Sequence, residues 1–341
     1  MTEDKGPEPS FSRSSVAVRT ERAYRLLLAG CALLTVVVTV GIVLTLVQNT
    51  AAFFLHVDPW SFLAGTQFAP FTAGTYGVLP LVSGTLVVTV GSAIIALPIG
   101  LAAGIYLSEY ASPRTRAILK PALEVLAGVP TIVYGYFALV YITPAFQALP
   151  IFPFSAQVLA PTTVALGGTE HVIAYTFVVP PLRTFNALSA SVVVGIMIIP
   201  MVSSISEDAL SAVPDDLRDA AYGLGSTKFD VSTKVVVPAA VSGIISSYVL
   251  ALSRAIGETM AVTVAAGMSP QMPYFPDVLR NFTDSVQTMT AAMVQIAGAE
   301  SLGETHALDA MYAIGLTLFV MTFAFNVASE WVRQRFREVY E

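Results

Sequence analysis

Six long apolar runs divide the chain, and each is close to the length that crosses a lipid bilayer. A transmembrane helix needs about 20 consecutive apolar residues, because the hydrocarbon core is about 30 Å thick and a helix rises about 1.5 Å per residue. Backbone groups that face lipid must bond within their own segment, so the spans are predicted to be helices. The predicted spans cover residues 25–48, 79–106, 121–145, 187–206, 239–266 and 309–332. The sequence therefore predicts an all-α integral membrane protein with six transmembrane helices.

Basic residues gather in alternate loops between these spans. Charged residues make up only 12% of the chain, whereas about a quarter is usual in soluble domains. The tail, the alternate loops and the C-terminal end hold Arg13, Arg19, Arg22, Arg25, Arg114, Arg116, Lys120, Arg218, Lys228, Lys234, Arg333, Arg335 and Arg337. The opposite loops hold only Arg183 and Arg280. Because cytoplasmic loops carry the excess of Lys and Arg, we predict a multi-pass protein of the cell membrane with both termini in the cytoplasm.

The chain divides into a polar tail and one membrane domain. Residues 1–23 contain Pro, Ser and mixed charge, and we predict that they form a disordered cytoplasmic tail. Residues 24–341 form the predicted transmembrane domain, whose main surroundings are lipid. The single cysteine, Cys31, cannot form an internal disulfide, and no nucleic-acid partner is expected.

The longest predicted cytoplasmic loop, residues 207–238, contains a short helix. Its apolar and small residues recur at helical spacing over residues 215–223. Gly225 follows, where a helix can end in a left-handed residue, and Pro238 opens span five, where a missing N–H costs nothing. Small residues let another protein surface approach closely; the alternative is a solvated amphipathic loop. The residues at i, i+3, i+4 and i+7 are Leu217, Ala220, Ala221 and Leu224.

This loop resembles the EAA loop of ABC-importer permeases. The pattern is Glu-Ala-Ala, three residues, Gly, nine residues, and an aliphatic pair that ends in Leu-Pro. The matching residues are Asp219, Ala220, Ala221, Gly225, Val235, Val237 and Pro238, with Asp in place of Glu and Val at both aliphatic positions. The resemblance implies that the loop couples the membrane domain to a separate ATPase subunit.

We do not expect the chain to hydrolyse ATP itself. The stretch GLGSTK at 223–228 lacks the Gly-Lys pair of a phosphate-binding loop, and no Gly-Lys pair occurs anywhere in the chain. The chain is therefore predicted to be a transporter subunit rather than an enzyme, with no bound cofactor. ATP and Mg²⁺ would be used by the partner ATPase.

Longer stretches are similar to phosphate-specific ABC permeases, more closely to the PstC type than to the related PstA type. They are GVLPLVSGTLVVTV (77–90), IYLSEYA (105–111), LKPALEVLAGVPTIVYGYFAL (119–139), ALSRAIGETMAV (251–262) and YAIGLTLFVMTFAFNVASEWVRQR (312–335). The resemblance implies a type I ABC importer permease architecture for residues 24–341. It also implies four partners: a second permease of PstA type, an ATPase dimer, an extracytoplasmic phosphate-binding protein and phosphate. The expected function is to form half of the pathway of an ATP-driven phosphate importer.

Arg254 and Glu258 place two full charges inside predicted span five. At i, i+4 they would share one helix face in the outer half of the membrane. A charge at the centre of a bilayer costs about 2.5–3.5 kcal/mol on insertion scales, so such residues usually face the bundle interior or a water-filled path. If the substrate is the phosphate that the resemblance implies, the guanidinium fork of Arg254 can bind two of its oxygens, with Glu258 as the resting partner. The alternative is a structural ion pair, or an Arg that reaches to the outer interface.

Thr85 is a candidate secondary ligand, because a hydroxyl can donate one hydrogen bond to an oxyanion. It neighbours Gly84 in span two. The alternative is a helix hydroxyl that bonds its own backbone. The three histidines, His56, His171 and His306, lie far apart in the sequence, and no metal site is predicted.

Several other functions remain open at this point. The chain could be a PstA-like partner permease, or an ABC permease for another oxyanion such as sulfate or molybdate. A membrane-embedded enzyme would show convergent His, Asp or Glu in the spans, whereas Arg254 and Glu258 are the main deep charges. A passive channel would have no use for the loop at 219–238.

Overall fold

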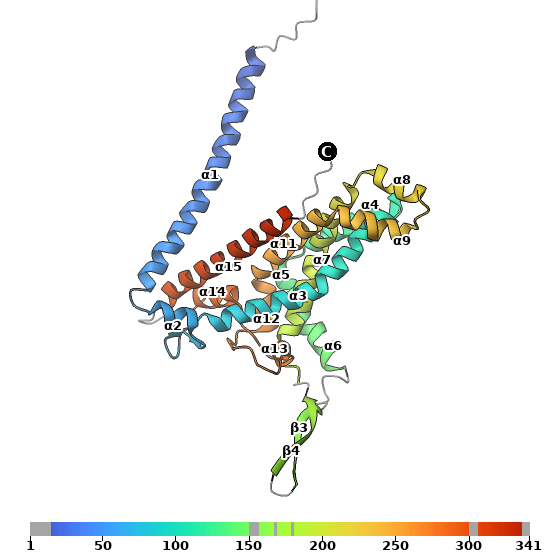
Figure 1. Cartoon of the computed structure of the whole chain (residues 1–341). Helices are drawn as coiled ribbons and strands as arrows, with labels where there is room; N and C mark the ends of the chain where they lie inside the picture. Colours follow the sequence, from blue (N-terminus) through green and yellow to red (C-terminus); the bar gives the residue numbers. More distant parts are fainter. Residues whose placement is uncertain (1–14, 150–156, 167–168, 179–180, 300–305, 336–341) are drawn as a thin grey trace, which may run out of the picture.

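The computed structural model describes residues 15–149, 157–166, 169–178, 181–299 and 306–335. Helices dominate the described chain (Figure 1). Four of them are long and apolar enough to cross a membrane, and up to six spans result if each of two bent helix pairs counts as one span. The four unbroken helices are α1 (Ser15–Phe53), α3 (Leu79–Ile105), α7 (Ala187–Ser211) and α15 (Ala307–Arg335). The predicted helical membrane architecture is confirmed.

The first helix, α1, begins well before the predicted span. Its apolar stretch is preceded by Arg and Glu residues, which favour helix, and the carboxylate of Glu21 lies 3.9 Å from the guanidinium of Arg25 one turn later. The predicted tail is therefore helical from Ser15 onward. Figure 1 shows α1 standing away from the bundle along most of its length, while its C-terminal part contacts α15.

The main core forms where α3 and α7 pack against each other. Small residues let the two backbones approach closely: a Cβ added at Gly100 would lie 2.6 Å from the Cβ of Val202, and one added at Gly91 would lie 2.4 Å from Oγ of Ser191. Buried Val and Ala side chains of both helices join the same cluster. After Ile105, α3 continues into a π-helical turn, η1 (Tyr106–Tyr110).

Predicted span three is sharply bent rather than straight. Its two halves meet at 88° after residue 127. Pro130 explains the break, because it lacks an N–H for the helix and disfavours helical conformation in the residue before it. The elements are α4 (Pro113–Ala127), α5 (Thr131–Phe137), the π-helical turn η2 (Ala138–Ile142) and α6 (Thr143–Gln147).

Predicted span five is interrupted at two places. The chain bends by 71° at Ala240 as it enters the span, and Gly257 ends the main helix before a second, shorter one begins. The elements from the cytoplasmic loop onward are α8 (Asp215–Gly223), α9 (Lys228–Val231), the π-helical turn η3 (Ser232–Val236), α10 (Val237–Ala239), α11 (Val241–Ile256) and α12 (Met260–Ala266).

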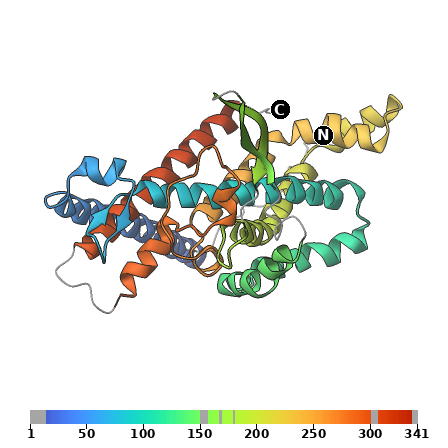
Figure 2. The ribbon, with the colours of Figure 1, turned by 90° about the horizontal axis from the view of Figure 1, so that it is seen from below.

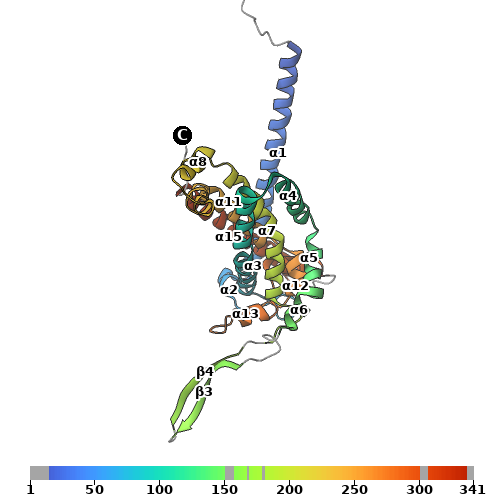
Figure 3. The same cartoon turned by 90° about the vertical axis from the view of Figure 1, so that its right-hand side faces the viewer.

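The opposite end of the molecule carries short helices and two antiparallel hairpins. In the larger hairpin Leu166 pairs with Thr169, and Figure 3 shows this hairpin extending away from the helices. The elements are α2 (Pro59–Ala64), β1 (Phe68–Ala69), β2 (Thr75–Tyr76), β3 (Gln157–Leu166), β4 (Thr169–Val178), α13 (Arg280–Thr283) and α14 (Met289–Ala297). The outer segments thus add strands that the sequence analysis did not predict.

The loop α8–α9 and the hairpin β3–β4 lie at opposite ends of the molecule (Figures 1 and 3). In the view from below, the α8–α9 region (yellow) and the α1–α2 region (blue) also lie far apart (Figure 2). The end that carries α8 holds the basic loops, so the excess of Lys and Arg predicts that this end is cytoplasmic.

Cysteine labelling tests this orientation. In a Cys31→Ser background, a membrane-impermeant thiol reagent should label Thr66→Cys in intact cells, because Thr66 is exposed at the end opposite α8. It should label Lys228→Cys, which is exposed in the α8–α9 loop, only after the membrane is permeabilised. The reverse pattern would show that the predicted orientation is wrong.

Candidate functional site

Helix α8 ends in the left-handed residue that the sequence predicts. Gly225 has φ +83°. The Gly225 N–H donates to the carbonyl of Tyr222 at 2.9 Å, and the Ser226 N–H donates to the carbonyl of Ala221 at 3.1 Å. These two bonds form a Schellman motif, which satisfies carbonyls at the helix end. A Cβ at Gly225 would meet nothing within 4 Å, so the backbone conformation rather than packing requires glycine.

The two faces of α8 have different surroundings. Ala221 is buried in a small apolar core with Leu210 of α7 and Val231 of α9. Asp219 and Ala220 are exposed. Ala221 therefore supports the helix from within, whereas the predicted docking surface is formed by its neighbours. The docking role of this surface stays a prediction.

Two large apolar side chains are exposed at the tip of this loop. Leu224 is 89% exposed and Phe229 is 66% exposed. Exposed apolar groups of this size in a loop outside the membrane favour contact with another protein. The helical spacing in the sequence continues to Leu224, but α8 ends at Gly223, and Leu224 is exposed in the turn that follows.

The rest of the loop leads back to the membrane through a bend. Pro238 lies in the short helix α10, and the main helix of span five begins only at Val241. The sequence analysis placed Pro238 at the start of span five, whereas it lies in the short helix that precedes the main helix of the span. Nearby, hydrogen bonds from Lys234 and Thr227 lower the pKa of Asp230, which keeps this carboxylate ionised on the loop surface.

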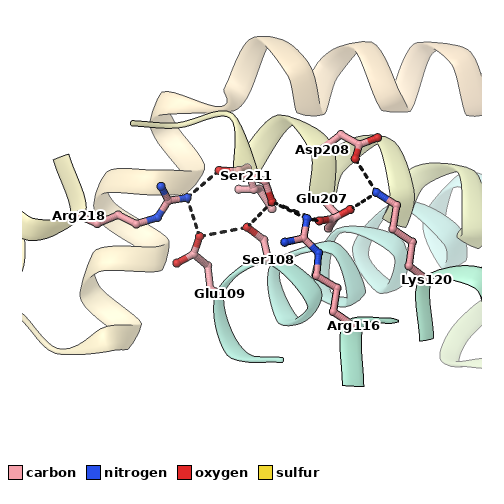
Figure 4. A network of polar contacts seen from close by, with 9 residues as sticks. Ser108, Glu109, Arg116, Lys120, Glu207, Asp208, Ser211 and Arg218 are labelled. Atoms are coloured by element: carbon pink, nitrogen blue, oxygen red, sulfur yellow. Dashed lines mark hydrogen bonds and ion pairs between the residues drawn. The ribbon is translucent and has the colours of Figure 1, made fainter. Parts of the chain in front are cut away.

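A fully buried carboxylate joins α4 to α7. Glu207 is 0% exposed. Its Oε1 accepts a hydrogen bond from the guanidinium of Arg116, and its Oε2 accepts one from Nζ of Lys120 at 2.6 Å. Lys120 also bonds Asp208 at 2.6 Å. The two cations of α4 neutralise the buried anion, so this contact holds α4 and α7 together at the end of the molecule that carries α8 (Figure 4).

A second ion pair joins α8 to the end of α3. A guanidinium N–H of Arg218 donates to Oε1 of Glu109 at 3.0 Å, and the two side chains are only 13% and 5% exposed. Arg218 also donates to the carbonyls of Leu210, at 2.8 Å, and Val213. Breaking such a buried pair by removing one partner typically costs about 3–5 kcal/mol. Sequence reasoning missed this pair, because residues 109 positions apart share no local pattern.

Arg254 lies in the last turn of α11 on an exposed face that it shares with Leu250. It forms no hydrogen bond or ion pair within the described residues. A cation at a helix C-terminus is favoured by the helix dipole, but this does not neutralise it. Its charge therefore has no counter-ion among the described residues.

Glu258 is buried beyond the end of α11. Its Oε1 accepts a hydrogen bond from the N–H of Ala261 at 3.2 Å, which caps α12. Its carbonyl accepts one from Oγ1 of Thr290 in α14 at 3.0 Å. The predicted common helix face of Arg254 and Glu258 is wrong, because the helix ends at Ile256 between them. Gly257 followed by Glu-Thr was the available signal for this break. Their predicted roles in the substrate path stay predictions.

Thr85 holds α14 against α3. Its hydroxyl donates to the carbonyl of Leu81 at 2.9 Å and accepts a hydrogen bond from the N–H of Met289 at 3.1 Å. The preceding residue, Gly84, packs so closely that an added Cβ would lie 2.3 Å from the carbonyl oxygen of Gln287. Both bonding directions of the Thr85 hydroxyl are used in packing, so phosphate would have to displace one of them.

Two of the three histidines meet at the outer end. The rings of His56 and His306 stack with centroids 4.5 Å apart, and Nδ1 of His306 lies 3.6 Å from a carboxylate oxygen of Asp309. In the described part of the chain, no three His, Cys, Asp or Glu side chains come together as metal ligands do. The side chain of His171 lies outside the described residues.

The family and its relatives agree with this geometry. Residues 96–338 match the family described as "Binding-protein-dependent transport system inner membrane component". A relative in Xylella fastidiosa, named Phosphate transport system permease protein PstC, is 32% identical over 95% of this chain and 94% of its own length. A relative in Bacillus subtilis, named Probable ABC transporter permease protein YqgH, is 31% identical over 91% of this chain and 90% of its own length.

A solved structure has a similar fold. It is the crystal structure of a bacterial ABC transporter involved in the import of the acidic polysaccharide alginate. The match has a TM-score of 0.54 at 12% identity and covers 94% of this chain and 99% of that chain. The chain therefore belongs to the family of binding-protein-dependent transport system inner membrane components, and it is a permease subunit of an ABC importer with the type I fold.

Proposed function

We propose that the chain is a permease subunit of an ATP-driven phosphate importer and forms half of its translocation pathway. A second permease of PstA type would form the other half. An ATPase dimer would supply the energy on the cytoplasmic side, and an extracytoplasmic binding protein would deliver phosphate. The name of the relative in Xylella fastidiosa supports phosphate as the substrate.

The unpaired charge of Arg254 is the observation that carries this proposal. From Val241 to Arg254, α11 rises about 20 Å at about 1.5 Å per residue, which is deep inside a bilayer. An unpaired cation there costs about 2.5–3.5 kcal/mol on insertion scales if it faces lipid. Arg254 has no partner among the described residues. The exposed face of α11 that carries it is therefore proposed to line a water-filled path between the two permeases. A phosphate ion on that path would meet a bidentate donor.

The exposed face and tip of α8 form the proposed ATPase contact. Asp219 and Ala220 leave room for close approach, and Leu224 offers an apolar anchor at 89% exposure. Burying an exposed Leu contributes about 1.5–3 kcal/mol. We therefore propose that the ATPase binds over this tip. The left-handed conformation of Gly225 sets the direction in which the chain leaves α8.

Leu224→Asp should detach the ATPase while the permease stays folded. The Leu224 side chain is 89% exposed in the described part of the chain, whereas a carboxylate in a closed interface would lack a partner. Co-purification of the ATPase should fall about tenfold or more, as expected from the loss of at least 1.5 kcal/mol. Leu55→Asp is the matched control, because Leu55 is 82% exposed near the opposite end and should leave the ATPase bound. Equal co-purification of both variants would refute the proposed contact.

Uptake competition tests the substrate. In cells that lack other phosphate transporters, the chain and its partners should support uptake of labelled phosphate. Unlabelled phosphate should abolish this uptake, and equal concentrations of sulfate or molybdate should leave it unchanged. Competition by sulfate or molybdate would instead assign the chain to another oxyanion importer.

A further inference from the structure

We propose that Arg218 is a positioning residue that fastens α8 to the cytoplasmic end of α3, so that movement of α8 reaches α3 through the Arg218–Glu109 ion pair. This inference rests on the proposed function, because α8 is displaced only if an ATPase docks on it. It assigns a specific contact to the transfer of that movement.

The surroundings of Arg218 support this role. Its guanidinium bonds acceptors on three separate elements: Oε1 of Glu109 in η1, the carbonyl of Leu210 at the end of α7, and Oδ1 of Asp215 in α8 itself. The carbonyl of Leu210 also accepts a hydrogen bond from the N–H of Val213 at 3.3 Å, so Arg218 adds a further donor at the end of α7. One side chain therefore ties α8 to two membrane helices (Figure 4).

Arg218 and the proposed docking residues lie on different faces of α8. The side chain of Arg218 is turned toward the membrane domain and is 13% exposed, whereas Asp219 and Ala220 are exposed. A force applied to the exposed face would therefore reach the membrane domain through the buried one. On the buried face of α8, Arg218 contacts the membrane domain through an ion pair. Ala221 contacts it through apolar packing.

Glu109 is placed where it can pass displacement along α3. The helix runs without a break from Leu79 to Tyr110, because η1 continues it. Glu109 lies 24 residues after Thr85, which corresponds to about 36 Å at about 1.5 Å per residue. At the far end, Thr85 bonds the N–H of Met289 in α14, and the next residue, Thr290, bonds the carbonyl of Glu258. A single helix thus connects the Arg218 contact with the break in span five.

Two serines connect this pair with the Glu207 contact. Oγ of Ser108 bonds Oε1 of Glu109 at 3.2 Å and lies 3.3 Å from Oγ of Ser211. Ser211 in turn bonds Oε1 of Glu207 at 3.2 Å. The cytoplasmic ends of α3, α4, α7 and α8 therefore share one polar network. Displacement of α8 should therefore move Glu109 as well, because the Glu109 side chain is bonded to this network.

Reconstituted complexes test the inference through the number of phosphate ions moved per ATP hydrolysed. In proteoliposomes with the complete transporter, Arg218→Gln and Glu109→Gln should each retain the ATPase and hydrolyse ATP. Phosphate moved per ATP should fall about tenfold, which corresponds to a loss of about 1.4 kcal/mol of coupling free energy. Because the two residues act as one unit, the double variant should fall no further than the lower single variant.

Lys234→Gln is the matched control. Lys234 also forms an ion pair on this loop, with Asp230, but it is 73% exposed, and the ratio should stay at the wild-type value. An unchanged ratio in Arg218→Gln and Glu109→Gln would overturn the inference. So would loss of the assembled complex in the nearly isosteric Glu109→Gln, since the pair would then be structural. If the wild-type complex neither binds the ATPase nor accumulates phosphate, the proposed function fails instead.

Discussion

Arg254→Gln should reduce phosphate uptake to background while the transporter still assembles. The guanidinium has no bonding partner among the described residues, so its removal breaks no hydrogen bond or ion pair among them. A hydrogen bond to a charged group contributes about 1.5–3 kcal/mol, and a bidentate contact with phosphate would lose two of them. Uptake of labelled phosphate and co-purification of the ATPase are measured together. Assembly should stay within the range of the wild type.

Two further variants sharpen this result. Arg254→Lys keeps the charge without the planar fork, so it should retain partial uptake. Arg114→Gln removes an exposed arginine at the cytoplasmic end and should leave uptake unchanged. If Arg254→Gln transports phosphate as well as Arg114→Gln does, Arg254 is not part of the substrate path.

Gly84→Val should abolish transport by a different route, through the packing of α14. A Cβ at this position would lie 2.3 Å from the carbonyl oxygen of Gln287, and backbone atoms cannot turn aside as a flexible side chain can. Overpacking typically costs about 1–3 kcal/mol, and occasionally more. The shift would break the bond between Thr85 and Met289 and move α14 away from Glu258. Both the melting temperature in detergent and phosphate uptake should fall.

Gly41→Val controls for the change of residue type. An added Cβ at Gly41 of α1 meets nothing within 4 Å, so the melting temperature should stay close to that of the wild type. Equal melting temperatures for the two variants would contradict the close contact between α3 and the segment before α14.

The spans could be predicted because their physical cause is local. Each apolar run must satisfy its own backbone in lipid, so α3, α7 and α15 lie where hydropathy places them. The breaks needed finer signals that the sequence does contain. Pro130 stops one helix, and Gly257 stops another. The alternating residues on both sides of Gly167-Gly168 are typical of a hairpin, and the structure has antiparallel strands there.

The ionic contacts at the cytoplasmic end could not be predicted in the same way. The buried Glu207 is neutralised by Arg116 and Lys120, which reach it from α4 and lie 91 and 87 residues earlier in the chain. The ion pair of Arg218 similarly depends on where η1 places Glu109. Such pairs result from tertiary packing, and no periodicity within a segment encodes them. The i, i+4 spacing of Arg254 and Glu258 misled for a different reason, because it assumed an unbroken helix across Gly257.

ATP-driven accumulation of labelled phosphate in proteoliposomes tests the central claim most directly. The vesicles contain this chain, the second permease and the ATPase dimer, with the binding protein on the side opposite the ATPase. The account predicts that phosphate accumulates only when ATP and Mg²⁺ are present on the ATPase side, and that neither sulfate nor molybdate accumulates. Phosphate that equilibrates without ATP would indicate a passive channel, and accumulation of another oxyanion in its place would contradict the assignment to phosphate.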